Sequence, residues 1–190
     1  MKSSVPKTLT DEELVMKVIT ESPDHFKTIV ERYQQKFFRY ILKYLYDQDK
    51  AEDIAQEAFI KIYMNLNAFD TNRNFSSWAY RIAHNEIVNY LRKNKHQVEV
   101  DSDTWLPNLA DDRPSLSEEL DRKISRQRLH QALNMLPIRY REVLILYYFQ
   151  GCDYQAVAEI LAVPVSTVST RINRAKRRLK KILTKEFDDV

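Results

Sequence analysis

The stretch that decides the fold runs from Asp153 to Lys185, DYQAVAEILAVPVSTVSTRINRAKRRLKKILTK. Its short apolar first part, the turn residues AVPV and its long basic second part predict a helix-turn-helix. At about 100° per residue, one face of the second helix carries Val168, Ile172, Ala175, Leu179 and Ile182. The opposite face carries Ser166, Thr170, Asn173, Arg174, Arg177 and Lys181. A face of hydrogen-bond donors and cations beside a buried stripe is what a helix needs to enter a DNA major groove. The stretch therefore predicts a DNA-binding protein.

The charge is distributed unevenly along the chain, although the net charge is only +3. Residues 171–185 contain eight Lys or Arg and no acid, whereas residues 99–121 contain eight acids and one Arg. This polarity indicates a nucleic-acid surface and an acidic connector. A solvated helix face is the alternative interpretation of the acidic run.

Composition favours a helical protein that lies in the cytoplasm. The 190 residues suffice for one large or two small domains, and one Gly with six Pro leaves little material for hairpin turns. The single Cys152 excludes an internal disulfide framework, which fits a reducing compartment. The longest apolar run, 143–149, is too short to span a bilayer, and the first residues do not resemble a secretory signal. We therefore expect no membrane insertion.

No metal site or cofactor is expected. The four His residues are scattered, no CxxC pair is present, and Cys152 stands alone. Asp53 and Glu57, four residues apart on one helix face, could share a metal ion in a nucleic-acid enzyme. Because no convergent His, third carboxylate or Gly-rich phosphate loop accompanies them, we expect the protein not to be an enzyme.

Helix signals divide the chain into two all-α domains. We expect domains at 1–94 and 115–190, joined by a flexible, acidic, proline-containing linker at 95–114. Expected helix starts are a capping box of Thr10 with Glu13, then Ser22-Pro23, Asp49, Asn74, Ser115 and Pro137. The helix from Pro137 is expected to run to Phe149 and to end at a left-handed Gly151.

The third expected helix, about 50–67, has an unusual outer face. That face combines two apolar residues with acids and an amide: Asp53, Gln56, Glu57, Ile60 and Met64. An apolar centre with a polar rim is typical of a docking surface, although single exposed apolar side chains are common.

The loop at 69–74 and the helix at 75–93 carry groups that suit unpaired bases. The candidate residues are Asp70, Asn72, Arg73, Asn74, Trp78, Arg81, Asn85, Asn89 and Arg92. Amides, cations and an indole along one edge can stack on bases and hydrogen-bond to them. For Trp78 a core position is the alternative interpretation.

With these elements placed, the chain resembles the extracytoplasmic-function (ECF) sigma factors, the dissociable promoter-recognition subunits of bacterial RNA polymerase. Three motifs in the order and spacing of that family carry the resemblance. They are AEDIAQEAFIKIY (51–63), FSSWAYRIAHNEIVNYLRK (75–93) and LPIRYREVLILYYFQGCDYQAVAEILAVPVSTVSTRINRAKRRL (136–179).

The resemblance implies a role for each domain. The first corresponds to sigma region 2, in which Asp53, Gln56 and Glu57 match positions that dock on the clamp helices of the largest polymerase subunit. The loop and the helix after it match the parts that recognise the −10 element as melted strand, with Asn85 and Asn89 at the extruded base. The second domain corresponds to region 4, which recognises the −35 element as duplex and contacts the polymerase flap.

The candidate −35 contacts are Ser166, Thr167, Ser169, Thr170, Arg171, Asn173, Arg174 and Arg177. Among them we expect Thr170, Asn173, Arg174 or Arg177 to discriminate bases. Arg171 lies toward the edge of the buried stripe, which suits phosphate contact or packing better. Ser169, Thr170 and Asn173 depart from residues common in the family, so a promoter sequence cannot be carried over.

The resemblance also implies promoter DNA, core RNA polymerase and an anti-sigma factor as partners. In the family the anti-sigma factor is often membrane-anchored, so the protein could be held at the membrane through it. The alternative function is a polymerase-independent helix-turn-helix regulator, which would usually bind palindromes as a dimer.

Overall fold

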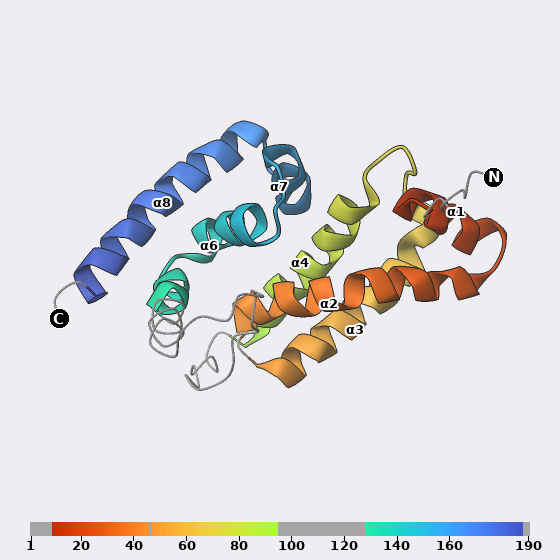
Figure 1. Cartoon of the computed structure of the whole chain (residues 1–190), viewed down its shortest axis with the longest axis horizontal. Helices are drawn as coiled ribbons and strands as arrows, with labels where there is room; N and C mark the ends of the chain where they lie inside the picture. Colours follow the sequence, from red (N-terminus) through yellow and green to blue (C-terminus); the bar gives the residue numbers. More distant parts are fainter. Residues whose placement is uncertain (1–8, 46, 95–127, 188–190) are drawn as a thin grey trace, which may run out of the picture. The chain divides into compact units, whose positions relative to one another are not determined.

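A computed structural model describes residues 9–45, 47–94 and 128–187, and all regular structure within these ranges is helical (Figure 1). The expected all-α fold is confirmed. The expected linker at 95–114 and the expected helix start at Ser115 lie outside the described residues. The chain divides into two compact units. The first contains α1 to α4, and the second contains α6, η3, α8 and most of α7.

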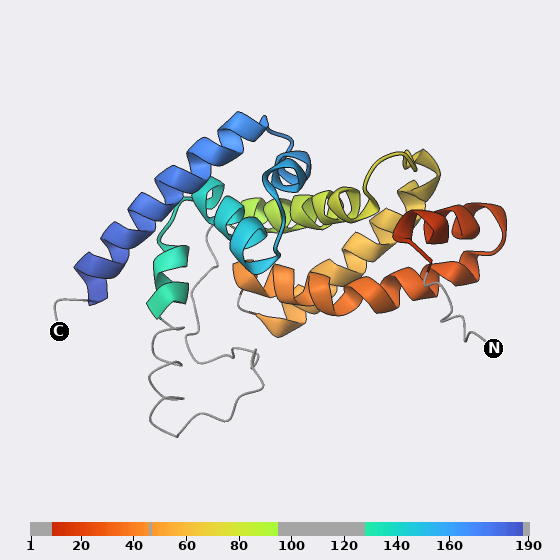
Figure 2. The same cartoon turned by 45° about the horizontal axis from the view of Figure 1, so that its top comes forward.

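The first unit is a small helical bundle. Its elements are α1 (Asp11–Thr20), the 3₁₀ turn η1 (Pro23–His25), α2 (Phe26–Leu45), α3 (Gln48–Asn65), the 3₁₀ turn η2 (Leu66–Ala68) and α4 (Phe75–Lys93). Helices α2, α3 and α4 pack on one another, and α1 packs on α2 and α4 (Figures 1 and 2).

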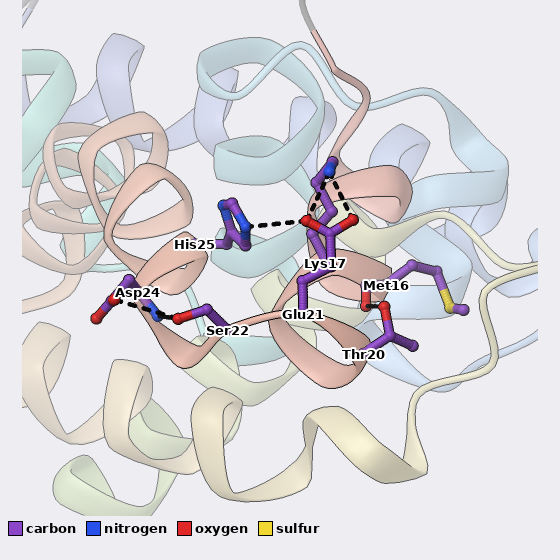
Figure 3. Close-up of polar contacts among 7 residues, drawn as sticks. All are labelled: Met16, Lys17, Thr20, Glu21, Ser22, Asp24 and His25. Atoms are coloured by element: carbon purple, nitrogen blue, oxygen red, sulfur yellow. Dashed lines mark hydrogen bonds and ion pairs between the residues drawn. The ribbon is translucent and has the colours of Figure 1, made fainter.

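Helix α1 begins and ends with side-chain contacts that the sequence encodes locally. At its start the expected capping box is present, since Glu13 N donates to Thr10 Oγ1 (3.1 Å) and Thr10 N to Glu13 Oε2 (2.8 Å). After its end Glu21 lies between Lys17 (2.7 Å) and the His25 ring (3.3 Å), as Figure 3 shows. The hydrogen bond from Lys17 lowers the pKa of Glu21. Pro23 begins a 3₁₀ turn, capped by Ser22, rather than the α-helix expected there.

One predicted helix start is wrong, and another is confirmed. Helix α3 is capped by Asp47, whose carboxylate accepts from Lys50 N at 3.0 Å, and not by Asp49. Both carboxylates could cap, and the helix begins two residues earlier than periodicity indicated. Helix α4 begins after Asn74, as expected, because the Asn74 amide oxygen accepts from Ser77 N at 2.9 Å.

The core of the first unit is aromatic. Tyr33, Phe37 and Tyr40 on α2 are almost fully buried, and their rings lie 5.1–6.5 Å from that of Tyr80 on α4 in tilted-edge arrangements. Such edge-to-face pairs add roughly 0.5–1.5 kcal/mol each beyond the area they bury. The Tyr40 hydroxyl hydrogen-bonds to Nδ1 of the buried His84 at 3.0 Å. This packing fixes the direction of α4 relative to α2 and α3.

The second unit contains helical residues 128–134, α6 (Ile138–Leu144), the π turn η3 (Ile145–Phe149), α7 (Tyr154–Leu161) and α8 (Val165–Phe187). The expected α-helix to Phe149 therefore changes to a π turn over its last five residues. In a π turn each N–H bonds the carbonyl five residues back, as Gln150 N does to Ile145 O at 3.1 Å. Gly151 follows with φ of 68°, the left-handed conformation expected for it.

The turn between α7 and α8 is tight. Ala162 adopts φ of 52°, and the Pro164 carbonyl accepts from Thr167 N (2.9 Å) and Val168 N (3.2 Å) to start α8. On α8 the predicted stripe is buried at Val168, Ile172 and Ala175, each at most 2% exposed, and helix α8 packs against α6. The helix-turn-helix is confirmed, with one face of α8 left outward.

Candidate nucleic-acid interface

The outward face of α8 is a row of exposed donors. Six predicted residues are exposed together, namely Ser166, Thr170, Asn173, Arg174, Arg177 and Lys181, while Thr167 and Ser169 are half-buried at its margin. The Thr170 hydroxyl donates to Ser166 O at 2.9 Å, so that hydroxyl is already engaged within the helix.

Arg171 is set apart from this row by an ion pair. Its guanidinium lies 3.0 Å from Oε1 of Glu142 on α6, whose residue exposure is only 8%. The charge of Arg171 therefore compensates a buried carboxylate and ties α8 to α6. Of the two roles expected for Arg171, phosphate contact and packing, this ion pair supports packing.

Arg174 is exposed and lies near the buried Tyr140 of α6. Burial by itself would raise the pKa of Tyr140, but Arg174 and the charges of Arg139 and Arg178 lower it overall. Helical periodicity does not predict this arrangement, because it depends on how α6 packs against α8.

The outer face of α3 is as exposed as its pattern predicted. Asp53, Gln56, Glu57, Ile60 and Met64 all lie at the surface. Ile60 is 53% and Met64 73% exposed. An isolated exposed apolar residue needs no explanation, but two on one face that is rimmed by acids indicate a contact surface.

The structure adds Tyr63 to this α3 face. The ring of Tyr63 is 45% exposed and packs edge-on against Phe26, with centroids 5.0 Å apart. Sequence analysis missed it, because Tyr63 lies between the two helix faces and periodicity assigns it to neither. A usable signal was the position of this aromatic residue directly between Ile60 and Met64 in the sequence.

The acids of the α3 face are paired with lysines. Asp53 lies 3.4 Å from Lys50, and Lys61 lies 3.5 Å from Glu57 and 2.6 Å from Glu86 on α4. The hydrogen bond to Glu86 raises the pKa of Lys61. Lys61 therefore links α3 to α4 directly beneath the face.

Two side chains of the loop between η2 and α4 fix its shape. Asp70 accepts from both nitrogens of Asn72 at 3.0 Å, and Asn74 caps α4. Glu12 on α1 also reaches this region and accepts from Phe75 N at 2.8 Å. Asn72 and Arg73 are left exposed at the tip of the loop.

Along α4 the predicted residues separate into exposed and half-buried groups. Arg81, Asn85 and Arg92 are exposed, and the half-buried Asn89 accepts weakly from Arg92 at 3.4 Å. Trp78 is half-buried, with its ring 5.0 Å from Phe69 and 5.7 Å from Phe75. The indole therefore packs against aromatic rings at both ends of the loop, and part of it stays exposed.

The described part of the chain contains no group of three or more His, Cys, Asp or Glu side chains able to hold a metal ion. Burial, with a smaller effect of Asp153, raises the pKa of Cys152 to about 11, so at neutral pH its thiol is a poor nucleophile. None of the helices in the described ranges is long and apolar enough to cross a membrane.

The exposed surfaces of the two units together define a class of protein. A helix-turn-helix unit with a basic outward helix is combined with a bundle that exposes an apolar-centred helix face and a polar loop. This combination describes a DNA-binding protein that also docks on another protein.

Comparisons with known proteins identify the family. The model of sigma-70 region 2 matches residues 29–97, and that of sigma-70 region 4 matches residues 126–179. The ECF RNA polymerase sigma factor SigW of Bacillus subtilis is 35% identical over 167 residues, covering 84% of this chain and 89% of the relative. The ECF RNA polymerase sigma-E factor of Escherichia coli K12 is 33% identical over 183 residues, covering 90% and 93%.

A solved structure agrees with these matches. It is the sigma factor RpoE of Bartonella quintana in complex with the anti-sigma factor NepR, which matches with a TM-score of 0.63 and 27% identity. The match covers 84% of this chain and 97% of that chain. The chain belongs to the ECF RNA polymerase sigma factors, and its function is to direct RNA polymerase to promoters.

Proposed function

We propose that the chain is a bipartite promoter-recognition subunit whose two units recognise different forms of DNA. The first domain, 1–94, docks on core RNA polymerase and binds the melted −10 strand, and the second, 115–190, binds the −35 duplex. The observation that carries this proposal is that one chain exposes both an apolar-centred face on α3 and a row of cations and hydrogen-bond donors on α8.

The docking step uses the exposed face of α3. Ile60 and Met64, with Tyr63 beside them, expose apolar area to water in the free chain. Docking removes this area from water, which favours binding. Asp53, Gln56 and Glu57 form the polar rim, which suits the register and specificity of a protein interface. By family likeness the partner surface is the clamp helices of the largest polymerase subunit.

The −10 step uses the loop at 70–74 and α4. Asp70 and Asn74 hold the loop, so that exposed Asn72 and Arg73 meet an unpaired strand without a large ordering cost. Arg81, Asn85 and Arg92 continue this surface along α4, and Asn89 and the edge of Trp78 border it. Binding the exposed strand offsets part of the cost of unstacking it, which is a few kcal/mol per step.

The −35 step uses the outward face of α8. Phosphate contacts set its position, and Thr170, Asn173, Arg174 or Arg177 discriminate the base pairs. Ser166, Thr167 and Ser169 lie at the N-terminal end of the same face, where a recognition helix meets base edges. Arg171 contributes by packing, because its charge is held by Glu142. The flap of the polymerase is the second protein contact of this domain.

The chain itself performs no chemistry in this account, since bond formation belongs to the polymerase. The two acids that could have suggested a nuclease, Asp53 and Glu57, are each paired with a lysine. We also propose a cytoplasmic location and an anti-sigma factor as a regulating partner, by likeness to the relative solved with one.

Core polymerase binding by the full-length chain tests the docking step. We expect Ile60→Ala combined with Met64→Ala to weaken binding at least tenfold, which corresponds to about 1.4 kcal/mol or more. Met16→Ala, on α1 and 44% exposed, is the matched control and should bind as the original chain does. Equal affinities for all three proteins would remove the α3 face from the interface. Complete absence of binding by the original chain would favour a polymerase-independent regulator.

A further inference from the structure

Three arginines converge on one tyrosine of the second unit. The guanidinium carbon of Arg139, at the start of α6, lies 5.1 Å from the centre of the Tyr140 ring. That of Arg178, on α8, lies 5.0 Å from the same centre. Arg174, one turn before Arg178, also lies close enough to Tyr140 to lower the pKa of its hydroxyl. All three arginines are exposed, whereas Tyr140 itself is only 5% exposed.

The cluster concentrates positive charge without a compensating acid. None of the three guanidinium groups forms an ion pair with a carboxylate of residues 9–45, 47–94 or 128–187. The carbons of Arg139 and Arg178 are at most about 10 Å apart, comparable to the screening length at ~0.1 M salt, so their charges repel. A bound anion relieves that repulsion.

The arginines of this cluster also keep N–H donors available for a ligand. A guanidinium held over an aromatic ring still has N–H donors directed to solvent, and two of them match two oxygens of a phosphate. Because Tyr140 is held in the core, the cation–π contacts with its ring partly order Arg139 and Arg178 before a ligand arrives. Less side-chain entropy is then lost when the ligand binds.

We propose that Arg139, Tyr140 and Arg178 form a binding site for a phosphodiester group of the DNA backbone. This inference rests on the proposed function, because it takes duplex DNA as the ligand of this domain. Arg174 connects the new site to the face proposed to recognise bases, since it lies on the outward row of α8 and also lies near Tyr140. A phosphate held at this site sets the register in which Arg174 meets a base edge.

An acidic protein segment is the other anion that three arginines could bind. The continuity of the site with the outward face of α8 favours DNA, because a strand that crosses that face must carry phosphates beside the bases it presents. Backbone binding is independent of sequence, so the test needs no knowledge of the promoter.

The test measures binding of the full-length chain to two unrelated duplexes of about 25 base pairs by fluorescence anisotropy, at several salt concentrations between roughly 0.05 and 0.2 M. We expect Arg139→Ala and Arg178→Ala each to lower the slope of log affinity against log salt by about 0.9. The double variant should lower it no further, because both arginines hold the same phosphate group, which counts once. The loss of affinity should be the same on both duplexes, because a phosphate carries no base information.

Lys27→Ala is the control, because it removes one exposed cation that lies outside the basic run at 171–185. Lys27 belongs to the other unit, and we expect its removal to leave the slope unchanged. Tyr140→Phe keeps the ring beneath the arginines but removes the hydroxyl, and it too should retain the slope. Arg178→Lys keeps the charge and loses the planar fork, so its affinity should fall between those of the original chain and Arg178→Ala.

Slopes for Arg139→Ala and Arg178→Ala equal to that of Lys27→Ala would overturn the site and leave an acidic protein segment as its ligand. Absence of duplex binding by the original chain would overturn it as well. Core polymerase binding, measured in parallel, separates the two proposals. If the chain fails to bind core polymerase while the arginine variants lower the slope, the site stands and the docking proposal fails.

Discussion

Replacing Arg171 by Ala removes the partner of a buried carboxylate and should destabilise the second unit. Glu142 on α6 has a side chain only 11% exposed, and Arg171 is its ion-pair partner at 3.0 Å. Breaking a fully buried pair costs about 3–5 kcal/mol. A smaller value applies here, because the Arg171 side chain is 26% exposed and Glu142 has a further interaction. The better comparison is a hydrogen bond to a charged group, which contributes about 1.5–3 kcal/mol to stability. We therefore expect Arg171→Ala to lower the free energy of unfolding by about 2 kcal/mol.

Hydrogen exchange measured by mass spectrometry reports this loss in the unit concerned. Peptides from α6 and α8 of the Arg171→Ala chain should exchange about 30-fold faster under native conditions, since 1.4 kcal/mol is tenfold. Peptides from α2 and α4 should be unchanged, because they belong to the other unit. Arg177→Ala is the matched control, because Arg177 is exposed on the same helix, and it should cost less than about 0.5 kcal/mol.

A double-mutant cycle with Glu142→Gln isolates the pair from other effects of each substitution. The two changes should be less than additive by about 1–2 kcal/mol, because both remove the same interaction. If Arg171→Ala exchanged within twofold of Arg177→Ala, the ion pair would contribute nothing to the stability of the unit. Arg171 would then be available as a DNA contact, contrary to the role assigned to it.

Three further predictions concern single positions. Gly151→Ala should destabilise the second unit by about 1 kcal/mol, because φ of 68° is unfavourable for a residue with a Cβ. The cost is conformational and not steric, since the added Cβ would meet no neighbouring group within 4 Å. An unchanged free energy of unfolding in urea would refute this prediction. Cys152 should react slowly with a thiol reagent at pH 7 and faster as the pH rises toward 11, and an apparent pKa below 9 would contradict the burial of its thiol. Because this pKa is raised by folding, stability should fall as the pH rises above about 9, and Cys152→Ser should remove that part of the fall. Arg174→Ala should reduce discrimination at one base pair of the promoter by roughly 1–3 kcal/mol. Lys181→Ala should instead weaken binding to all sequences equally. Uniform losses of affinity from both variants would show that Arg174 does not recognise a base.

Local signals in the sequence predicted much of the fold. Thr10 with Glu13 and Asn74 mark helix starts because short polar side chains followed by helix formers have few other uses. The exposure of Ile60, Met64 and the outward row of α8 follows from helical periodicity, which needs no tertiary information. These rules could not decide between Asp47 and Asp49, which lie two residues apart, because either carboxylate could have capped α3.

The contacts that define the second unit could not be predicted in the same way. The pairing of Arg171 with Glu142 and the grouping of Arg139, Tyr140 and Arg178 depend on how α6 packs on α8. The π turn η3 was not predicted either, whereas the left-handed Gly151, two residues after its end, was. The family was recognisable from three motifs, while the roles of individual site residues stay predictions.

In vitro run-off transcription tests the central claim most directly. Core RNA polymerase would be combined with the full-length chain on fragments of the genome of the source bacterium. We predict discrete transcripts that require the chain and that share −10 and −35 elements upstream of their start sites. The Ile60→Ala and Met64→Ala double variant should produce fewer of these transcripts. Core polymerase that gives the same transcripts with and without the chain would contradict the account.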